Sequence, residues 1–246
     1  MSAALGFRRW VKRREHPVAR AAWRLAHGLR SAEMPCLPAL HAPLYRLSRA
    51  VSGLVGEAAR FGWWTPLFRS QLARSGRGLR LEGSMPLLMG PLSIEVGSDV
   101  TINGQTTITG RDGGGSARAF LSIGDRTYVG WQTTIAVGTR VVIGRDVKIA
   151  GRCLIAGYPG HPLDPEARAA GQPCRAEQIG PVVLEDGVWL ATGVTVVAGV
   201  RIGAGTVVAA GSVVTRDLPA RVLAAGAPAR VVREIARQSS TAEHRP

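Results

Sequence analysis

Large aliphatic residues recur at an unbroken spacing of six residues in the second half of the chain. They occupy Leu184, Leu190, Val196, Ile202, Val208 and Val214. Small or branched residues stand four places after most of them, and glycines fill many of the positions between. A period of this kind predicts a β-solenoid, in which short strands send their aliphatic residues inward and stacked coils share one continuous core. Glycine supplies the backbone freedom that each corner needs.

The same spacing of six also occurs upstream, with interruptions. Triplets stand at Val96/Ile102/Ile108, Ile123/Val129/Ile135 and Ile143/Ile149/Ile155. Three hexapeptides make one triangular coil, so the sequence predicts about five coils, which start near residues 96, 123, 143, 184 and 202. A β-sandwich that is rich in Val, Ile and Gly by chance does not explain six consecutive repeats. The repeat has three interruptions: a Gly-rich loop over 110–120, two extra residues between 135 and 143, and a longer loop over 157–182. Long loops in compact folds are usually functional or disordered.

The basic charge of the chain is concentrated at its N-terminal end. The formal net charge is +14, and residues 1–80 hold 15 Lys and Arg against three Glu. Leu44, Leu47, Val51, Leu54, Val55 and Ala58 follow a helical period there, and Val18, Ala22, Leu25 and Leu29 form a shorter stripe. We expect two or three helices and then an extended lead-in through 80–94. Three roles stay open for this segment: a cap on the first coil, a peripheral contact with an anionic membrane surface, or nucleic-acid binding. No nucleic-acid motif accompanies the charge, so that role is the least favoured.

Cysteine usage and hydropathy bear on the compartment. The three cysteines, Cys36, Cys153 and Cys174, have irregular spacing and form no CxxC pair, which favours a reducing cytoplasmic setting over a disulfide framework. The sequence contains no apolar run long enough for a membrane-spanning helix and no secretory signal pattern. We therefore expect a cytoplasmic protein, which a membrane contact of residues 1–80 would place peripherally at the inner membrane surface.

One histidine of the five lies in the solenoid region. His161 stands in the 157–182 loop and is followed by Pro162, Asp164 and Pro165. Imidazole is the usual general base near neutral pH, although a histidine in a loop can also be an ordinary surface residue. No group of His and Cys residues has the spacing of a metal site, so we expect no metal cofactor.

Three stretches resemble a known family. HPLDPEARAAG (161–171), GPVVLEDGVWLATGVTVVAGVRIGAGTVVAAGSVVTRDLPA (180–220) and AAGAPARVVREI (224–235) occur in this order. They are similar to the hexapeptide-repeat acyltransferases, above all to the maltose, galactoside and nodulation-factor O-acetyltransferase group, over roughly residues 94–236. The resemblance implies a left-handed parallel β-helix, a homotrimer with active sites in the grooves between subunits, and acetyl-CoA or another acyl-CoA as donor. His161 would be the general base that takes the proton of an acceptor hydroxyl.

The resemblance also implies roles for eight further residues. Trp189 matches a tryptophan near the active-site groove, and Arg230 and Arg233 match basic positions near the phosphates of the coenzyme. The positions that match the lining of the coenzyme tunnel are Ala150, Thr192, Ala210, Thr215 and Arg216. The family carries an asparagine in the coil before the histidine, where this chain has Gly130-Trp131-Gln132. Its N-terminal acceptor-binding segment is not recognisable in residues 1–80, so the acceptor cannot be carried over.

The fold prediction is therefore mainly β, with a helical N-terminal extension (1–80), a β-helix (81–220) and a C-terminal segment (221–246) that ends in a helix from about residue 228. The predicted function is an acyl-CoA-dependent O-acyltransferase for a hydroxyl of a small molecule or glycan. A serine- or amine-directed acetyltransferase is the enzymatic alternative. A non-catalytic β-helix scaffold is the alternative of a different class.

Overall fold

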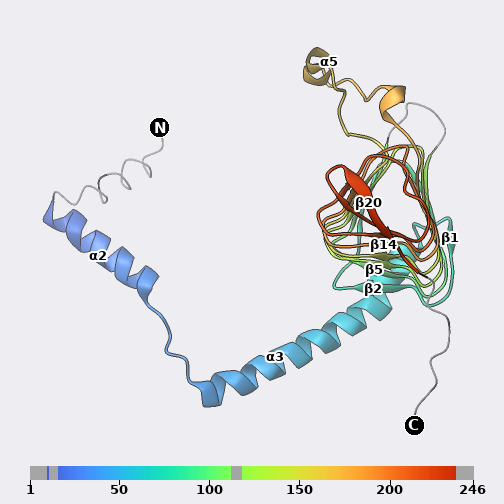
Figure 1. Ribbon diagram of the computed structural model, residues 1–246. Coiled ribbons are helices and arrows are strands. Elements are labelled where there is room, and N and C mark those ends of the chain that lie inside the picture. The colour runs from blue at the N-terminus through green and yellow to red at the C-terminus, as the bar shows by residue number, and fades with distance from the viewer. Residues whose placement is uncertain (1–9, 11–15, 112–117, 237–246) are drawn as a thin grey trace, which may run out of the picture. The chain divides into compact units, whose positions relative to one another are not determined.

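The computed structural model describes residues 10, 16–111 and 118–236, and the chain divides into two units, Met1–Ser52 and Gly53–Pro246. The second unit is a parallel β-helix with three sheets, and Figure 1 looks nearly along its axis, so that the coils overlie one another. The first sheet contains β1 (Arg74–Ser75), β4 (Leu92–Val96), β7 (Ala119–Ile123), β10 (Arg140–Ile143), β13 (Val182–Leu184) and β16 (Arg201–Ile202). The second sheet contains β2 (Arg80–Glu82), β5 (Thr101–Asn103), β8 (Tyr128–Val129), β11 (Lys148–Ile149), β14 (Trp189–Leu190), β17 (Val207–Val208), β19 (Val222–Gly226) and β20 (Ala229–Glu234). The third sheet contains β3 (Leu87–Met89), β6 (Thr107–Gly110), β9 (Thr134–Val137), β12 (Leu154–Ala156), β15 (Thr195–Val196) and β18 (Val213–Val214).

The aliphatic residues of the six-residue repeat form the core. Register pairs join equivalent repeat positions in successive coils, such as Ile135 with Ile155 and Ile149 with Leu190. The repeat residues from Ile102 to Val214 are at most 2% exposed. The alternation of inward and outward residues along each strand confirms the prediction of a solenoid.

The described residues contain one coil more than the five predicted. β1, β2 and β3 form a first coil over the region where we expected a helical end and an extended lead-in. The repeat is not visible there because β1 is exposed and offers no aliphatic residue to the interior. Phe68 fills this end of the core instead.

Among the described residues, four helical segments precede the coils: α2 (Pro17–Ser31), α3 (Pro38–Ala59), the π-helix η1 (Arg60–Trp64) and α4 (Thr65–Arg69). Phe68 of α4 is fully buried in the core, and Trp64 and Leu72 pack against it. These residues cap the first coil, as the end of a solenoid requires. The cap role is thus fulfilled by the last part of the N-terminal segment.

The prediction of a C-terminal helix from about residue 228 is wrong over the described residues. Residues 229–234 form β20, which pairs antiparallel with β19, after a turn at Gly226 with a φ of 105°. Without β20, strand β19 would leave an open edge at the end of the second sheet. Residues 229–234 form hydrogen bonds with this edge, and this pairing outweighs the helical pattern of the segment. Residues 237–246 lie outside the described residues, as do residues 112–117 of the predicted 110–120 loop.

Candidate functional site

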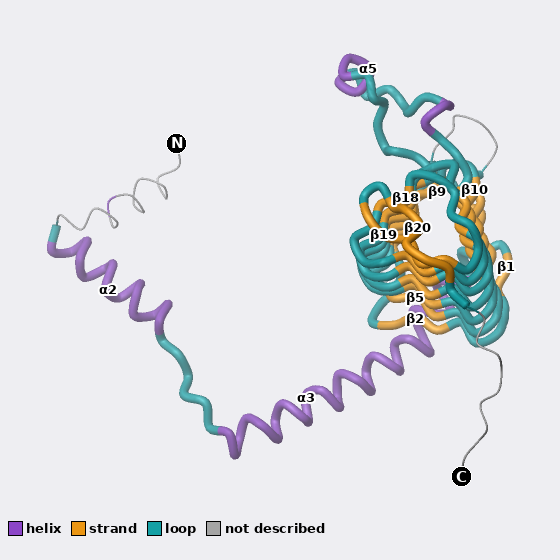
Figure 2. The backbone as a smooth tube through the Cα atoms, in the orientation of Figure 1, coloured by secondary structure: helices purple, strands orange, loops and turns teal. Residues whose placement is uncertain are grey.

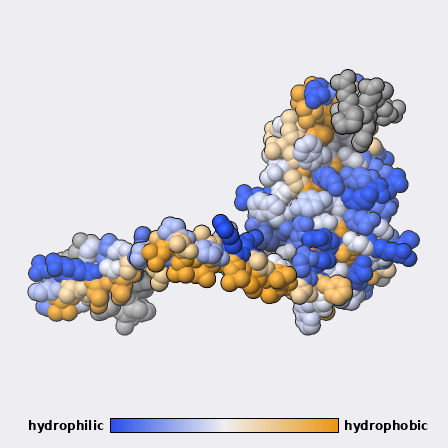
Figure 3. Space-filling view, turned by 90° about the horizontal axis from the view of Figure 1, so that it is seen from below, coloured by the Kyte–Doolittle hydropathy of each residue, from blue (hydrophilic) through white to orange (hydrophobic). Residues whose placement is uncertain are grey.

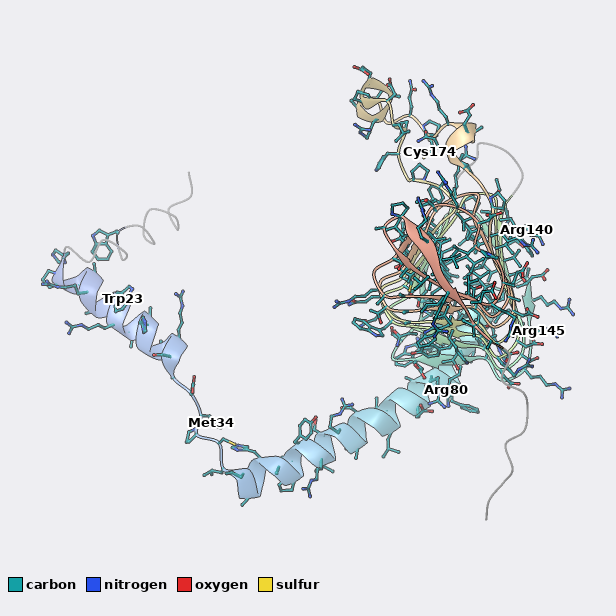
Figure 4. The ribbon with its side chains drawn as sticks, viewed as in Figure 1. Trp23, Met34, Arg80, Arg140, Arg145 and Cys174 are labelled. Atoms are coloured by element: carbon teal, nitrogen blue, oxygen red, sulfur yellow. The ribbon has the colours of Figure 1, made fainter. Side chains whose placement is uncertain are left out.

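The longest break in the repeat is a loop that leaves the β-helix after β12 and returns at β13. Its two ends meet, because the Gly180 N–H donates a hydrogen bond of 3.0 Å to the Gly157 carbonyl. The Tyr158 and Thr109 hydroxyls are 3.1 Å apart, which fixes the loop to an earlier coil. Between these anchors the loop projects away from the coils, with α5 (Pro165–Ala169) and the 3-10 helix η2 (Ala176–Gln178) in it (Figure 2). Cys174 lies on this loop in Figure 4 and is buried.

His161 lies on the outgoing part of this loop. The side chain is exposed, and it follows Gly160, whose φ of 88° allows the chain to turn. Neither ring nitrogen forms a hydrogen bond with any residue that the structure describes. An imidazole in this state has a nitrogen available to accept a proton from a bound hydroxyl.

The residues after His161 hold the loop in one conformation. Pro162 is buried, and the Arg168 guanidinium donates to the carbonyls of Pro162 and Leu163 at 3.0 and 3.1 Å. The Asp164 carboxylate accepts a hydrogen bond of 2.7 Å from the Ala167 N–H and is the N-cap of α5. Asp164 therefore serves the short helix and does not orient the imidazole.

Three of the predicted coenzyme residues come together at the corner between the second and third sheets. Ala150, Thr192 and Ala210 belong to three successive coils there, and the Gly211 N–H donates to the Thr192 carbonyl at 2.9 Å. Gly193 and Gly211 have φ values of 73° and 69° at this corner. Glycine adopts this conformation without strain, and it leaves the backbone of the corner bare. A Cβ on Gly211 would meet nothing within 4 Å, so the corner is open there, whereas a Cβ on Gly151 would meet the Trp131 ring, which covers the corner beside Ala150.

Thr215 and Arg216 lie at the other corner of the third sheet. Both are exposed and directly follow β18, and the loop of His161 leaves from the end of β12 at the same corner, two coils earlier. The third sheet is thus flanked by two groups of predicted site residues.

The remaining predicted residues lie on the second sheet. Trp189 is 51% exposed on its outer face, in register with Lys148 and Val207. Arg230 and Arg233 are exposed on β20, opposite Ala225 and Leu223 of β19. These side chains are accessible to a ligand. Trp189 is three residues before Thr192, in the strand that leads into the corner between the second and third sheets, whereas Arg230 and Arg233 lie on β20.

A cluster that the sequence did not predict occupies the place of the family asparagine. The Arg152 guanidinium lies 4.8 Å from the ring centroid of Trp131, and its Nε donates to the Gln132 side-chain oxygen at 3.3 Å. Gln132 and Arg152 both have positive φ values, 52° and 61°. The sequence indicated this position because Gly130-Trp131-Gln132 stands where the family has an asparagine. The contact of Arg152 with Trp131 and Gln132 is seen only in the structure, where neighbouring coils stack.

Ion pairs mark the corner between the first and second sheets. The Arg126 guanidinium donates two hydrogen bonds of 2.7 Å to the Asp146 carboxylate. This side-chain hydrogen bonding is the main reason that the pKa of Asp146 is lowered. The pKa of Asp186 is lowered chiefly by the backbone N–H of Arg145 and then by its guanidinium. Arg140 and Arg145 both lie at the outside of the coils in Figure 4. These exposed pairs link neighbouring coils and show no feature of a catalytic site.

The described residues include no group of three or more His, Cys, Asp or Glu side chains that could hold a metal ion. None of the helices in the described part of the chain is long and apolar enough to cross a membrane.

Comparison with known proteins supports the repeat and the fold. Residues 181–216 match the family model described as bacterial transferase hexapeptide (six repeats). The repeat is that of the hexapeptide transferases. The Saccharomyces cerevisiae protein named "Putative acetyltransferase YJL218W" is 44% identical over 49% of this chain and 59% of its own length. The galactoside O-acetyltransferase of Escherichia coli is 37% identical over 47% of this chain and 54% of its own length. The chain therefore spans just over half the length of the curated relatives that it matches.

A solved structure shows the same fold. The S84C mutant of AntD, an N-acyltransferase from Bacillus cereus in complex with dTDP-4-amino-4,6-dideoxyglucose and coenzyme A, has a TM-score of 0.55. The similarity covers 70% of this chain and 89% of that chain at 17% identity, so it bears on the fold alone. These matches confirm the predicted resemblance to hexapeptide-repeat acyltransferases and the mainly β, left-handed parallel β-helix.

Proposed function

We propose that this chain is an acyl-CoA-dependent O-acyltransferase that transfers an acyl group, most simply acetyl, to a hydroxyl of a saccharide or glycan-type acceptor. The observation that carries the proposal is the exposed His161 imidazole, without a hydrogen bond to the described residues, on a projecting and anchored loop. The matched relatives support the reaction class, because one is named a galactoside O-acetyltransferase.

The proposed reaction is a direct transfer. His161 takes the proton of the acceptor hydroxyl as its oxygen attacks the thioester carbonyl. The resulting tetrahedral intermediate breaks its carbon–sulfur bond, and the imidazolium returns the proton to the departing thiolate. The products are an acyl ester and free coenzyme A, and no acyl-enzyme is formed. The enzyme contributes a base and the positioning of two substrates, and backbone N–H groups of the coils would stabilise the oxyanion.

The coenzyme would lie along the third sheet. Ala150, Thr192 and Ala210 would contact it at the corner where Gly193 and Gly211 leave the backbone bare. Thr215 and Arg216 would contact it at the corner from which the His161 loop leaves. Arg230 and Arg233 would face the phosphates, since guanidinium groups suit phosphate recognition. Trp189 would lie beside the acceptor groove.

We further propose a homotrimer in the cytoplasm. The imidazole of His161 has no orienting hydrogen bond within the described residues of its own chain, so a groove shared with a neighbouring subunit would supply one. The exposed Cys36 and the buried Cys153 and Cys174 are free thiols, which agrees with a reducing setting. A peripheral membrane contact through residues 1–80 is a separate proposal that depends on α2 and α3 alone.

The test is the release of free thiol from acetyl-CoA with a panel of sugars, glycan intermediates, serine and amines. A sugar or glycan hydroxyl should give turnover, and His161→Ala should abolish it. His27→Ala is the matched control, since it removes another exposed imidazole far along the chain from the loop. Full turnover by His161→Ala would overturn the mechanism. Turnover with serine or amines alone would favour the enzymatic alternative, and no turnover with any acceptor would favour the scaffold.

A further inference from the structure

Helix α3 presents a continuous apolar stripe that no described residue covers. None of its 22 residues is buried. The stripe consists of residues that are 49–74% exposed: Leu40, Leu44, Leu47, Val51, Leu54 and Val55. Their spacing of three and four residues places them on one side of a helix with 3.6 residues per turn. Figure 3 shows hydrophobic residues gathered along one side of this helix.

The other side of α3 is basic. Arg49 is nine residues after Leu40 and so lies opposite it on the helix, with Arg46 nearby. Neither arginine forms an ion pair within the described residues. The one acid of α3, Glu57, is held by Arg60 and, at 3.1 Å, by Arg80. The polar side of the helix therefore keeps a positive charge that is free to meet an anionic partner.

Helix α2 repeats this design. Val18, Leu25 and Leu29 are 58–71% exposed on one side, and Arg20 and Arg24 lie on the other. From residue 16 to residue 64 the chain holds six arginines, no lysine and two acids. Two separate helices thus combine an exposed aliphatic face with an arginine face.

The β-helix does not account for these faces. The cap on the first coil is made by Phe68 with Trp64 and Leu72, all after α3. A nucleic acid would pair with the arginines and leave both apolar stripes in water. A second copy of the chain could cover a stripe, but it would leave the arginines, which lie on the far side of each helix, without an anionic partner.

We propose that α2 and α3 lie in the interface of an anionic lipid bilayer. The stripe of α3 and the matching face of α2 would enter the boundary of the acyl chains, and the arginines would meet lipid phosphates. Neither helix crosses the bilayer, which agrees with the absence of a spanning helix among the described residues. The inference does not depend on the proposed transferase activity.

The test is flotation of the full chain with vesicles of phosphatidylcholine, and with vesicles that also contain phosphatidylglycerol. Binding should occur on the anionic vesicles and weaken as salt rises, because counterions screen the arginines. Each of Arg46→Gln and Arg49→Gln should weaken binding about fivefold, the effect of about one kcal/mol per basic residue near the surface.

Val51→Glu separates the stripe from the charge. It puts a carboxylate in the stripe, whereas the matched control Ser52→Glu puts the same group on an exposed position outside it. Val51→Glu should weaken flotation at least tenfold more than Ser52→Glu. Both variants should keep the thermal unfolding midpoint and thiol release with a water-soluble acceptor, while His161→Ala should keep flotation. The two proposals therefore fail independently.

Three results would overturn the membrane proposal. The first is no flotation at low salt, or equal flotation on neutral and anionic vesicles. The second is equal effects of Val51→Glu and Ser52→Glu. The third is a larger assembly of the unmodified chain than of Val51→Glu in vesicle-free sedimentation, since a second copy would then be the partner of the stripe.

Discussion

The β-helix and helix α3 each carry a periodic row of aliphatic residues. The row of the β-helix is buried, and the row of α3 is exposed. In the coils the row from Leu184 to Val214 is at most 1% exposed. In α3 the residues of the apolar stripe are at least 49% exposed. Hydrophobic residues at a regular period therefore predict which face is apolar, but the surface that covers the face must be supplied by something else.

The difference follows from how each element finds a partner. A strand of the solenoid pairs with the equivalent strand of the next coil, so each repeat packs against another copy of the same repeat. A single helix has no such neighbour built into its sequence. Within the described residues, α3 continues into η1 and α4, and burial begins only at the end of this run, with Thr65 and Phe68.

A pair of phenylalanine variants tests where burial begins. Phe68→Ala should destabilise the fold by about 3–5 kcal/mol, because Phe68 is fully buried and its removal leaves a cavity at the end of the core. Phe61→Ala should change stability by less than about 0.5 kcal/mol, because Phe61 is 80% exposed. Thermal unfolding followed by circular dichroism measures both, and equal shifts would show that the cap includes Phe61 as well as Trp64.

A pair of leucine variants compares the two rows directly. Leu184→Ala should cost about 2–5 kcal/mol, since Leu184 is fully buried between coils. Leu54→Ala makes the same chemical change at a residue that is 74% exposed and should leave the unfolding midpoint nearly unchanged. A large loss of stability in Leu54→Ala would mean that α3 packs on the protein in solution.

A pair of threonine variants asks what holds the corners of the coils. Thr206 is buried, and its hydroxyl donates to the Pro219 carbonyl at 2.6 Å and accepts from the Val222 N–H at 3.3 Å. Thr206→Val should cost about 1–3 kcal/mol, because both backbone groups lose their partner. The Thr106 hydroxyl is equally buried but has no hydrogen-bond partner in the described structure. Thr106→Val should therefore be neutral or stabilising, and a loss similar to that of Thr206→Val would contradict this role of the hydroxyl.

The smallest effect concerns the ion pairs outside the core. The Asp186 pKa is lowered in the folded state, so its contribution to stability is present above the ordinary aspartate pKa of about 4 and is lost as the pH falls through the folded pKa. Asp186→Asn keeps an acceptor for the Arg145 N–H but removes the charge. The difference in unfolding midpoint between this variant and the unmodified chain should be small and constant near neutral pH, and should shrink below about pH 4. A difference that grows on acidification would reverse the sign of the linkage.

Most of the fold could be predicted from the sequence, with two errors of physical origin. The first coil was missed because β1 has no inward aliphatic residue, so a coil exists without its signature. The C-terminal helix was predicted from a local pattern, but Val231 and Arg233 lie in a strand because β19 offers them an edge. Both errors occur at the ends of the solenoid, where the partner is not another copy of the repeat.

The candidate site divides in the same way. The loop position of His161 followed from the break in the repeat, since an insertion between two regular coils must project outward. Gln132 and Arg152 are 20 residues apart, like the paired Ile135 and Ile155, but the repeat does not specify that their side chains and the Trp131 ring contact one another. The period of the repeat predicts which corner residues stack, but not which polar contacts their side chains form.

The sequence by itself determined the period, and hence the β-helix, its core residues and the loop that carries His161. This was possible because each repeat specifies both its own strand and the surface on which the next strand packs. Only the tertiary structure decided which residues close the ends of the solenoid and which side chains meet at its corners. It also showed that the apolar row of α3 stays exposed, because a hydrophobic face in a sequence does not specify the surface that will cover it.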